Sequence, residues 1–255
     1  MSGRLNDRVL AVVGASAGMG LAIAQLCASE GAKVVMLARG KERLEKEATA
    51  IGATAIVCDV MDPSSVRAAF AQIGEKFGHL NALVNVAGVA RIRRIEDASD
   101  EDIQYVMGIN LLGPIYTTRS AIPLMRAAGG GDIINMSSEI TMDYFLPSMT
   151  LYGTSKGGLD AFSRSMVHEL KADKIRVGNV ISGTFATDFA ANFDMDEMMA
   201  AYPEWEASGY LTRIAGPAQD AAWMAEAIVF QLTRPAGQMI DVIHVRSFAP
   251  GHPPA

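Results

Sequence analysis

The sequence lacks the features that several classes of protein need. No apolar run within its 255 residues approaches the ~18 residues required to span a bilayer, and the first eight residues lack the apolar core of a signal peptide. The formal net charge is −6 and no block of basic residues is present, which argues against nucleic acid as a partner. We therefore expect a protein that binds neither membranes nor nucleic acid.

Cysteine is scarce as well, with two residues in the chain. Cys27 falls in the first helical segment and Cys58 at the end of a strand-like run, and neither has the spacing of a metal ligand or an evident redox partner. We interpret both as buried thiols in a reducing compartment. The sequence therefore predicts a cytoplasmic protein without a metal site.

What the chain has in abundance is short runs of Val, Ile and Leu that alternate with helical patterns. Such runs, flanked by Gly, Asp or Asn, are typical of strands covered on both faces. Strands are expected near residues 8–13, 33–37, 54–58, 81–85, 132–136, 175–181 and 238–243. Helices are expected near residues 18–29, 41–50, 63–77, 100–127, 152–172 and 217–232. Asp62-Pro63-Ser64 and Ser99 are start signals for helices, and Gly78 is a stop signal.

This alternation predicts a single α/β domain over residues 1–255, with a doubly wound parallel sheet flanked by helices. No change in composition indicates a second domain. Residues 188–212 have no strand pattern and are expected to form a substrate-binding flap, whereas the tail at about 248–255 is expected to be irregular.

A glycine-rich turn follows the first expected strand, in the segment Gly14-Ala15-Ser16-Ala17-Gly18-Met19-Gly20. Gly14 allows a tight turn, Gly18 a close approach of the backbone to a ligand, and Gly20 close packing of helix on strand. The amides that open the helix would face a phosphate group, which the helix dipole also favours. The pattern is G-x-x-x-G-x-G and predicts a Rossmann-type dinucleotide site.

The same residues allow a second interpretation. Gly14-Ala15-Ser16-Ala17-Gly18 also reads G-x-S-x-G, the nucleophile elbow of α/β-hydrolases. That elbow requires a Ser, an acidic residue and a His in this order along the chain, and four histidines are available here. The elbow also normally follows several strands, whereas this turn follows the first expected strand. We favour the dinucleotide site.

A tyrosine and a lysine lie four residues apart in Tyr152-Gly153-Thr154-Ser155-Lys156, fourteen residues after Ser138. On a helix these two side chains share a face and can enter one pocket. A free tyrosine has a pKa of about 10, and lowering it by about 3 units takes roughly 4 kcal/mol. Lys156 and a positively charged oxidised nicotinamide are the groups that would supply this stabilisation.

With these motifs in this order, the chain resembles the short-chain dehydrogenase/reductase family from about residue 5 to 245. The motifs are Gly14-x-x-x-Gly18-x-Gly20, Asp59-Val60, Asn85-Val86-Ala87-Gly88, Asn110, and Ser138 with Tyr152 and Lys156. Three positions and one segment depart from the family pattern: Val13 stands for Thr, Val86 for Asn, Ser182 for Pro, and Val242-Ile243-His244-Val245 for V-D-G-G. None of these departures removes a catalytic group.

The resemblance implies a role for each catalytic residue. Tyr152 would be the general acid in reduction and the general base in oxidation. Lys156 would lower the pKa of Tyr152 and hold the nicotinamide ribose, Ser138 would hydrogen-bond the substrate oxygen, and Asn110 would hold a water in the proton relay. The resemblance also implies a Rossmann fold of about seven strands.

The cofactor would be NADP(H), with NAD(H) as the alternative. The second strand ends at Ala38-Arg39. An acidic residue at this place would accept hydrogen bonds from a free ribose 2′-hydroxyl and would repel a 2′-phosphate. The sequence has no acidic residue there, and the guanidinium of Arg39 can bind a phosphate. Asp59 would meet the adenine and Val60 its ring face. The implied cofactor residues are Gly14, Ser16, Ala17, Gly18, Met19, Gly20, Ala38, Arg39, Asp59, Val60, Asn85, Ala87, Gly88, Tyr152, Lys156, Gly183, Phe185 and Thr187.

The substrate pocket is expected to be apolar, because Met and aromatic residues cluster at 142–149 and 185–205. Its residues would be Ser138, Met142, Met149, Tyr152 and Phe189; alternatively, the apolar set packs the flap onto the core or an interface. These segments lack an Arg or Lys that would bind a carboxylate or phosphate, so we expect neutral, fairly bulky ketones as substrates. A homotetramer or homodimer is expected from the resemblance, through the helices at about 100–127 and 152–172. Their apolar faces would be furnished by Ala121, Ile122, Leu124, Met125, Leu159, Phe162 and Met166.

We therefore expect an NADP(H)-dependent oxidoreductase, a carbonyl reductase or alcohol dehydrogenase that interconverts a ketone or aldehyde and a secondary alcohol. One alternative is an NAD-dependent alcohol dehydrogenase of the same family. The other, from a different class, is a nucleotide-binding redox sensor without turnover.

Overall fold

One parallel sheet organises the molecule. The computed structural model describes residues 3–142, 146–209 and 217–247. Its seven strands are hydrogen-bonded in the order β3-β2-β1-β4-β5-β6-β7, so the predicted doubly wound α/β fold is confirmed. The strands are β1 (Val9–Val13), β2 (Lys33–Ala38), β3 (Thr54–Val57), β4 (Ala82–Asn85), β5 (Gly131–Ser138), β6 (Ile175–Ser182) and β7 (Val242–Val245).

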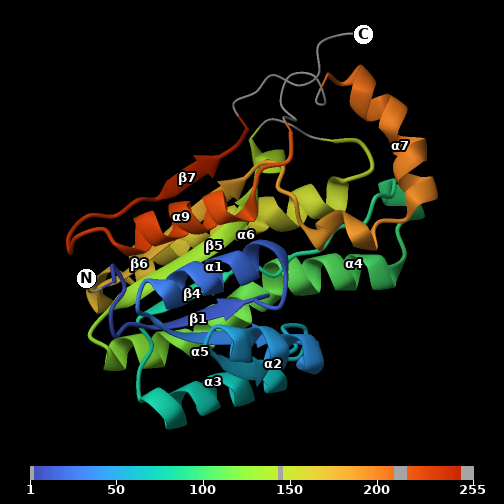
Figure 1. Ribbon diagram of the computed structural model, residues 1–255. Coiled ribbons are helices and arrows are strands. Elements are labelled where there is room, and N and C mark those ends of the chain that lie inside the picture. Colours follow the sequence, from blue (N-terminus) through green and yellow to red (C-terminus); the bar gives the residue numbers. More distant parts are fainter. Residues whose placement is uncertain (1–2, 143–145, 210–216, 248–255) are drawn as a thin grey trace.

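Helices cover both faces of the sheet (Figure 1). They are α1 (Gly18–Ser29), α2 (Lys41–Ala50), α3 (Pro63–Phe77), α4 (Asp100–Met107), α5 (Gly113–Ala127), α6 (Thr150–Glu169), α7 (Met195–Ala207) and α9 (Ala221–Leu232). α1, α2 and α9 share one apolar cluster, and α3, α5 and α6 share the other. Because strand side chains alternate, Leu10 and Val12 of β1 enter the first cluster while Val9, Ala11 and Val13 enter the second.

The predicted helix signals act as expected at α3 and α4. The Asp62 carboxylate accepts a hydrogen bond from the amide of Ser64 at the start of α3, and Gly78 ends that helix with a φ of 74°. Ser99 and Asp102 form a reciprocal cap at the start of α4. These caps fix where the helices begin relative to the strands.

Three segments differ from the sequence prediction. The expected helix at 100–127 is interrupted by a π-helical turn, η2 (Gly108–Leu112), and the expected strand at 238–243 is found at Val242–Val245. The register of β7 is set by pairing with β6, which begins at Asn179 opposite Val242. Residues Met195–Ala207 of the expected flap form α7. The tail at 248–255 and residues 210–212 of the flap lie outside the described residues.

The strands all run in one direction, so the sheet has two unlike edges. We call the edge where the strands end the carboxyl edge and the edge where they begin the amino edge. In open α/β sheets, ligands bind beyond the carboxyl ends of the strands. Among the helices of the described residues, none combines the length and apolar character needed to cross a membrane.

Candidate active site

Two adjoining cavities open at the carboxyl edge. The first, of about 640 Å³, is lined by the glycine-rich turn and the end of β2, and we call it the glycine cavity. The second, of about 380 Å³, is lined by Ser138, Tyr152 and Lys156, and we call it the tyrosine cavity. Met19, Val86, Gly88, Thr187 and Phe189 line both. A ligand that fills the first cavity can therefore reach Tyr152 and Lys156 in the second.

The glycine-rich turn has the close approaches that its sequence predicts. Gly14 has a φ of +86°, and a Cβ there would lie 2.7 Å from the amide nitrogen of Ala87. At Gly20 a Cβ would lie 2.1 Å from the carbonyl oxygen of Gly14. The N-cap residue of α1, Ala17, offers no side-chain cap. A side chain at Gly14 or Gly20 would therefore clash with neighbouring backbone. Because no side chain caps the first amides of α1, these amides can bind an anion.

The end of β2 carries a cation into the glycine cavity. Ala38, Arg39 and Gly40 line it, and Arg39 has no ion-pair partner among the residues that the structure describes. Nearby, Arg43 of α2 donates to Asp188 at 3.0 Å, which joins α2 to the segment after β6. The guanidinium of Arg39 is therefore available to a ligand phosphate.

Two of the predicted cofactor residues are not brought to the cavity. The Asp59 carboxylate accepts from the amide of Met61 at 2.9 Å, and Asp59 is not in the lining, whereas Val60 is. Asn85 is buried in the core, where its side chain donates to Asn135 and accepts from Thr117, each at 2.8 Å. Ala87 and Gly88, which follow Asn85, do line the cavity.

The two residues predicted to be catalytic on α6, Tyr152 and Lys156, lie in the tyrosine cavity. Tyr152 and Lys156 are 8% and 3% exposed, and the Lys156 ammonium lies 5.9 Å from the centre of the Tyr152 ring. The Lys156 ammonium donates to the carbonyl of Met136 at 2.7 Å. Ser138, at the end of β5, is hydrogen-bonded to Tyr152. The three side chains thus line the same part of the cavity wall.

The chain's own groups move both pKa values toward the neutral forms. Burial raises the pKa of Tyr152 to about 12, with the negative charge of Glu139 adding to this shift and the hydrogen bond with Ser138 opposing it. Burial lowers the pKa of Lys156 to about 8, against the attraction of Asp160. This is opposite to the lowering of the Tyr152 pKa that the sequence suggested. Tyr152 therefore keeps its proton, the form that a general acid needs.

The π-helical turn positions Asn110. Its buried side chain accepts from the amide of Val89 at 2.8 Å, and donates to the carbonyl of Val89 at 2.8 Å and to Ser155 at 3.0 Å. A Cβ at Gly88 would lie 3.5 Å from the Lys156 ammonium and 3.7 Å from the Asn110 carbonyl oxygen. Asn110 thus fixes the loop after β4 against α6, beside both cavities. Such π turns are frequent at functional sites.

Comparison with known proteins fits this geometry. The family model described as short chain dehydrogenase matches residues 8–198. The chain belongs to the short-chain dehydrogenase family. It is 32% identical over 230 residues to carbonyl reductase family member 4 of Xenopus laevis, covering 90% of this chain and 92% of that protein. It is 32% identical over 231 residues to the 3-oxoacyl-[acyl-carrier-protein] reductase of Bos taurus, with the same coverage of each chain.

Solved structures agree. L-sorbose reductase from Gluconobacter frateurii, complexed with NADPH and L-sorbose, superposes with a TM-score of 0.82 at 27% identity, covering 96% of this chain and 97% of that chain. The protein is thus an oxidoreductase enzyme, a short-chain dehydrogenase with one Rossmann-type sheet.

In this short-chain dehydrogenase the far wall of the tyrosine cavity is apolar. Met149 and Phe189 line it as predicted, and the Phe189 ring lies 5.7 Å from that of Tyr152. Met142 is 41% exposed and is not in the lining. Gly183 and Phe185 line this cavity, and Thr187 lines both. The remaining apolar lining includes Ile140, Leu146, Phe193 and Trp205.

The flap helix α7 is tied down by charge and by a hydrogen bond. Trp205 donates from its indole nitrogen to the carbonyl of Pro147 at 2.8 Å. Arg93, in the loop after β4, is paired with Glu197 of α7, and Arg94 lies 3.6 Å from Glu204. Ala201 and Trp205 of α7 are also buried, in an apolar cluster with Met149 and Tyr152. Apolar packing therefore holds α7 over the cavity together with these partly exposed polar contacts.

One acidic residue of the cavity was missed at the sequence level. Glu139 follows Ser138, is 3% exposed and lines the tyrosine cavity. One of its carboxylate oxygens lies 3.7 Å from a ring nitrogen of His244, and a Cβ at Gly183 would lie 3.0 Å from that oxygen. Glu139 and His244, the latter at a position where the family pattern has Gly, therefore face each other. The available signal in the sequence was a Glu directly after Ser138, the predicted catalytic serine.

Proposed function

We propose that this short-chain dehydrogenase is an NADP(H)-dependent carbonyl reductase that interconverts a ketone or aldehyde and a secondary alcohol. The observation that carries the proposal is the meeting of Tyr152, Lys156 and Ser138 in a cavity that adjoins the glycine cavity. The relatives named carbonyl reductase and 3-oxoacyl reductase, and the neighbour complexed with NADPH, support the same reaction class.

The glycine cavity fits a dinucleotide. Gly14, Gly18 and Gly20 line this cavity and allow the turn to pack closely on its neighbours, and the first amides of α1 would hold the pyrophosphate. Arg39 would bind the ribose phosphate that distinguishes NADP(H), since Ala38 places no carboxylate against it. When bound, NADP(H) supplies the hydride for reduction.

The protein's part in reduction is proton transfer. Tyr152, protonated because its pKa is raised to about 12, would give its proton to the carbonyl oxygen of the substrate while Ser138 hydrogen-bonds the same oxygen. The ammonium of Lys156 would stabilise the tyrosinate that remains. Asn110 would hold the backbone that brings a relay water to Lys156. In oxidation, the same tyrosinate would take the proton back.

The substrate would be neutral and fairly bulky. Met149, Phe189, Phe193 and Trp205 supply apolar walls, and the buried carboxylate of Glu139 would repel an anionic substrate. Glu139 also favours a second candidate, a hydroxyketone, because its oxygens can accept hydroxyl hydrogen bonds. L-Sorbose, bound by the neighbouring reductase, is such a compound.

A cofactor and substrate matrix tests the proposal. We expect wild-type enzyme to oxidise NADPH faster than NADH with a bulky aryl ketone, and to prefer this ketone or a hydroxyketone over a keto acid in kcat/KM. Arg39→Ala should weaken NADPH binding and change NADH binding little, and Ala38→Asp should shift preference towards NADH. A preference for NADH would favour the NAD-dependent alcohol dehydrogenase, and cofactor binding without turnover on any carbonyl would favour the sensor.

Assembly and location complete the proposal: a homotetramer, or a homodimer, in the cytoplasm. Of the side chains suggested for the interface, four are buried in the monomer: Ala121, Met125, Leu159 and Met166. The other three, Ile122, Leu124 and Phe162, are only partly buried and remain candidates. Exposed apolar side chains on the α4–α5 segment, Ile103 and Leu112, are available as well. The two free buried thiols, Cys27 and Cys58, suit a reducing compartment. A monomer mass in light scattering, or secretion of the tagged protein, would overturn this part.

A further inference from the structure

A large cavity lies at the amino edge of the sheet, away from the strand ends that form the active site. Its volume is about 860 Å³, larger than either cavity at the carboxyl edge. It lies among the start of β1, the α5–β5 turn, the end of α6, the start of β6 and the segment between α9 and β7. Sites for small molecules commonly have volumes of about 300–1,000 Å³. We call it the amino-edge cavity.

The charge of this lining differs from that of the whole chain. The chain has a formal net charge of −6, yet the amino-edge cavity has six cationic side chains and a single carboxylate, that of Asp132. The six are Arg4, Arg8, Lys171, Lys174, Arg176 and Arg234. Such a local excess of positive charge attracts anions.

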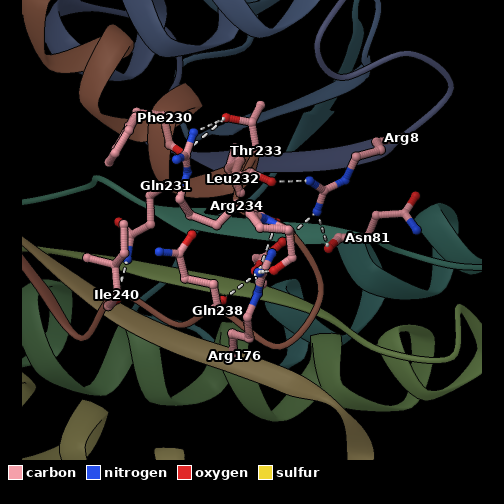
Figure 2. A network of polar contacts seen from close by, with 12 residues as sticks. Arg8, Asn81, Arg176, Phe230, Gln231, Leu232, Thr233, Arg234, Gln238 and Ile240 are labelled. Carbon is pink, nitrogen blue, oxygen red and sulfur yellow. Dashed lines mark hydrogen bonds and ion pairs between the residues drawn. The ribbon is translucent and has the colours of Figure 1, made fainter.

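Two of the arginines are held in place by backbone carbonyls (Figure 2). Arg8 donates to the carbonyls of Leu232 at 2.6 Å and of Asn81 at 3.3 Å. Arg176 donates from one terminal nitrogen, Nη1, to the carbonyls of Arg234, Pro235 and Gln238, the last at 2.8 Å. Their side chains are each 25% exposed. Both guanidinium groups are therefore preorganised at the cavity wall.

Asp132 balances only part of this charge. Its two oxygens accept from Arg8 and from Arg176, each at 2.6 Å, so one carboxylate serves two guanidinium groups. The second terminal nitrogen of Arg176, Nη2, makes no hydrogen bond to any residue that the structure describes. A partly buried, fixed cation thus keeps two N–H donors for a ligand.

The lysines add charge that is not neutralised. Within the described part of the chain, Lys171 and Lys174 have no ion-pair partner, because Asp173 between them is bound to Arg126 at 2.7 Å. The remaining cations have other duties: Arg4 pairs with Glu30 and Glu226, and Arg234 covers the Phe230 ring at 3.8 Å. Cations are stabilised near the C-terminal ends of helices, and the ends of α6 and α9 explain some of these charges in that way. This effect alone does not explain why the cations line a cavity.

We propose that the amino-edge cavity is a second ligand site, which binds a small polyphosphate group, either inorganic or carried by a nucleotide. Several negative charges match the excess of cations, the fixed guanidinium of Arg176 presents paired donors to phosphate oxygens, and the exposed lysines close over them as mobile point charges. The site is separate from the oxidoreductase site and does not depend on the proposed reaction.

Isothermal titration calorimetry with inorganic tripolyphosphate tests the site in the full chain, with saturating NADPH present to occupy the glycine cavity. We expect binding in wild type that weakens with salt, and at least about tenfold weaker binding in Lys171→Gln/Lys174→Gln, since two unneutralised charges are removed. The matched control is Lys33→Gln/Lys76→Gln, which removes two lysines outside all three cavities and should bind as wild type.

The other arms separate the sources of the phosphate and the competing site. ATP binding more tightly than tripolyphosphate identifies a nucleotide, equal affinity identifies the phosphates alone, and adenosine should not bind. Arg39→Ala should leave tripolyphosphate binding unchanged, because Arg39 lines the glycine cavity. Absence of tripolyphosphate binding overturns the proposal. So does binding that survives in the Lys171/Lys174 variant but is lost in Arg39→Ala, because the phosphate then lies in the glycine cavity.

Discussion

A buried ionisable side chain is in ion pairs at the amino edge of the sheet, whereas at the carboxyl edge Tyr152 and Lys156 lie beside a cavity without an ion-pair partner among the described residues. At the amino edge, the Asp132 carboxylate is bonded to two guanidinium groups, and these bind backbone carbonyls. At the carboxyl edge, Tyr152 and Lys156 are buried beside an open cavity, and burial displaces both pKa values. Paired charges hold elements together, whereas displaced, unpaired ones are ready to exchange protons. Substitutions at the amino edge should therefore change stability, and those at the carboxyl edge should change rate.

The largest expected effect is that of Tyr152→Phe on rate. Phe keeps the ring that packs near Phe189 but removes the transferable proton, so kcat for carbonyl reduction should fall by at least about 10²–10⁴-fold. The melting temperature and the NADPH affinity should stay close to wild type. Steady-state kinetics with thermal melts and cofactor titration check this. If the variant keeps most of its activity, Tyr152 is not the proton donor, and the claim that carboxyl-edge substitutions change rate is wrong.

Asp132→Asn should give the converse result at the amino edge. The change leaves two guanidinium groups facing each other without a carboxylate, and it should cost about 2–3 kcal/mol of unfolding free energy, less than a fully buried pair because the arginines are 25% exposed. Activity per folded molecule should be kept. Urea unfolding measures the loss of free energy. The control is Asp173→Asn, whose pair with the exposed Arg126 should contribute much less to stability because solvent screens it. Equal losses in both variants would contradict the special status of Asp132.

Lys156→Met is expected to separate rate from stability at one residue. Burial lowers the Lys156 pKa from 10.5 to about 8, so holding the ammonium in the folded state is unfavourable by about 1.4 kcal/mol per pKa unit. The variant also loses the hydrogen bond to the Met136 carbonyl, which is worth about 1 kcal/mol. Because this loss is smaller than the gain from removing the buried ammonium, the variant should be as stable as wild type or more stable at pH 7. Its turnover should collapse.

The pH dependence of that difference follows from the same shift. Between about pH 8 and 10.5, the unfolded chain binds a proton at Lys156 that the folded chain has released, so wild type gains stability from this group as pH rises. The advantage of Lys156→Met in urea unfolding should thus shrink between pH 7 and pH 9.5. An advantage that grows over this range would show that the ammonium is stabilising, as at the amino edge.

The comparison also explains what could be read from the sequence. The glycine turn and the Tyr152–Lys156 pair are local patterns, so both were predicted and both line the cavities. Arg8, Asp132 and Arg176 lie far apart in the chain and are brought together by the order of the strands, in which β4 separates β1 from β5. No local spacing signals such a network. For the same reason the proximity of Glu139 to His244 was missed.

Some side chains and one strand lie elsewhere than the sequence indicated, because tertiary packing determines their positions. Asn85 belongs to a family motif, but its side chain is directed to Asn135 and Thr117 in the core. Met142 has an apolar side chain of the expected kind, yet it lies in the turn after η3 (Glu139–Thr141) and is exposed. The last strand was placed early because its start is determined by β6 and not by its own apolar residues.

The smallest expected effect concerns Glu139, whose carboxylate lies near His244 at the carboxyl edge. Its negative charge adds to the burial that raises the pKa of Tyr152, so Glu139→Gln should lower that pKa. Alcohol oxidation requires the tyrosinate, and its rate should therefore begin to rise at a lower pH in Glu139→Gln than in wild type. Glu139→Asp keeps the charge and should follow the wild-type profile more closely. If the charge acts only by pairing with His244, as charges do at the amino edge, Glu139→Gln will lose stability while the pH profile stays in place.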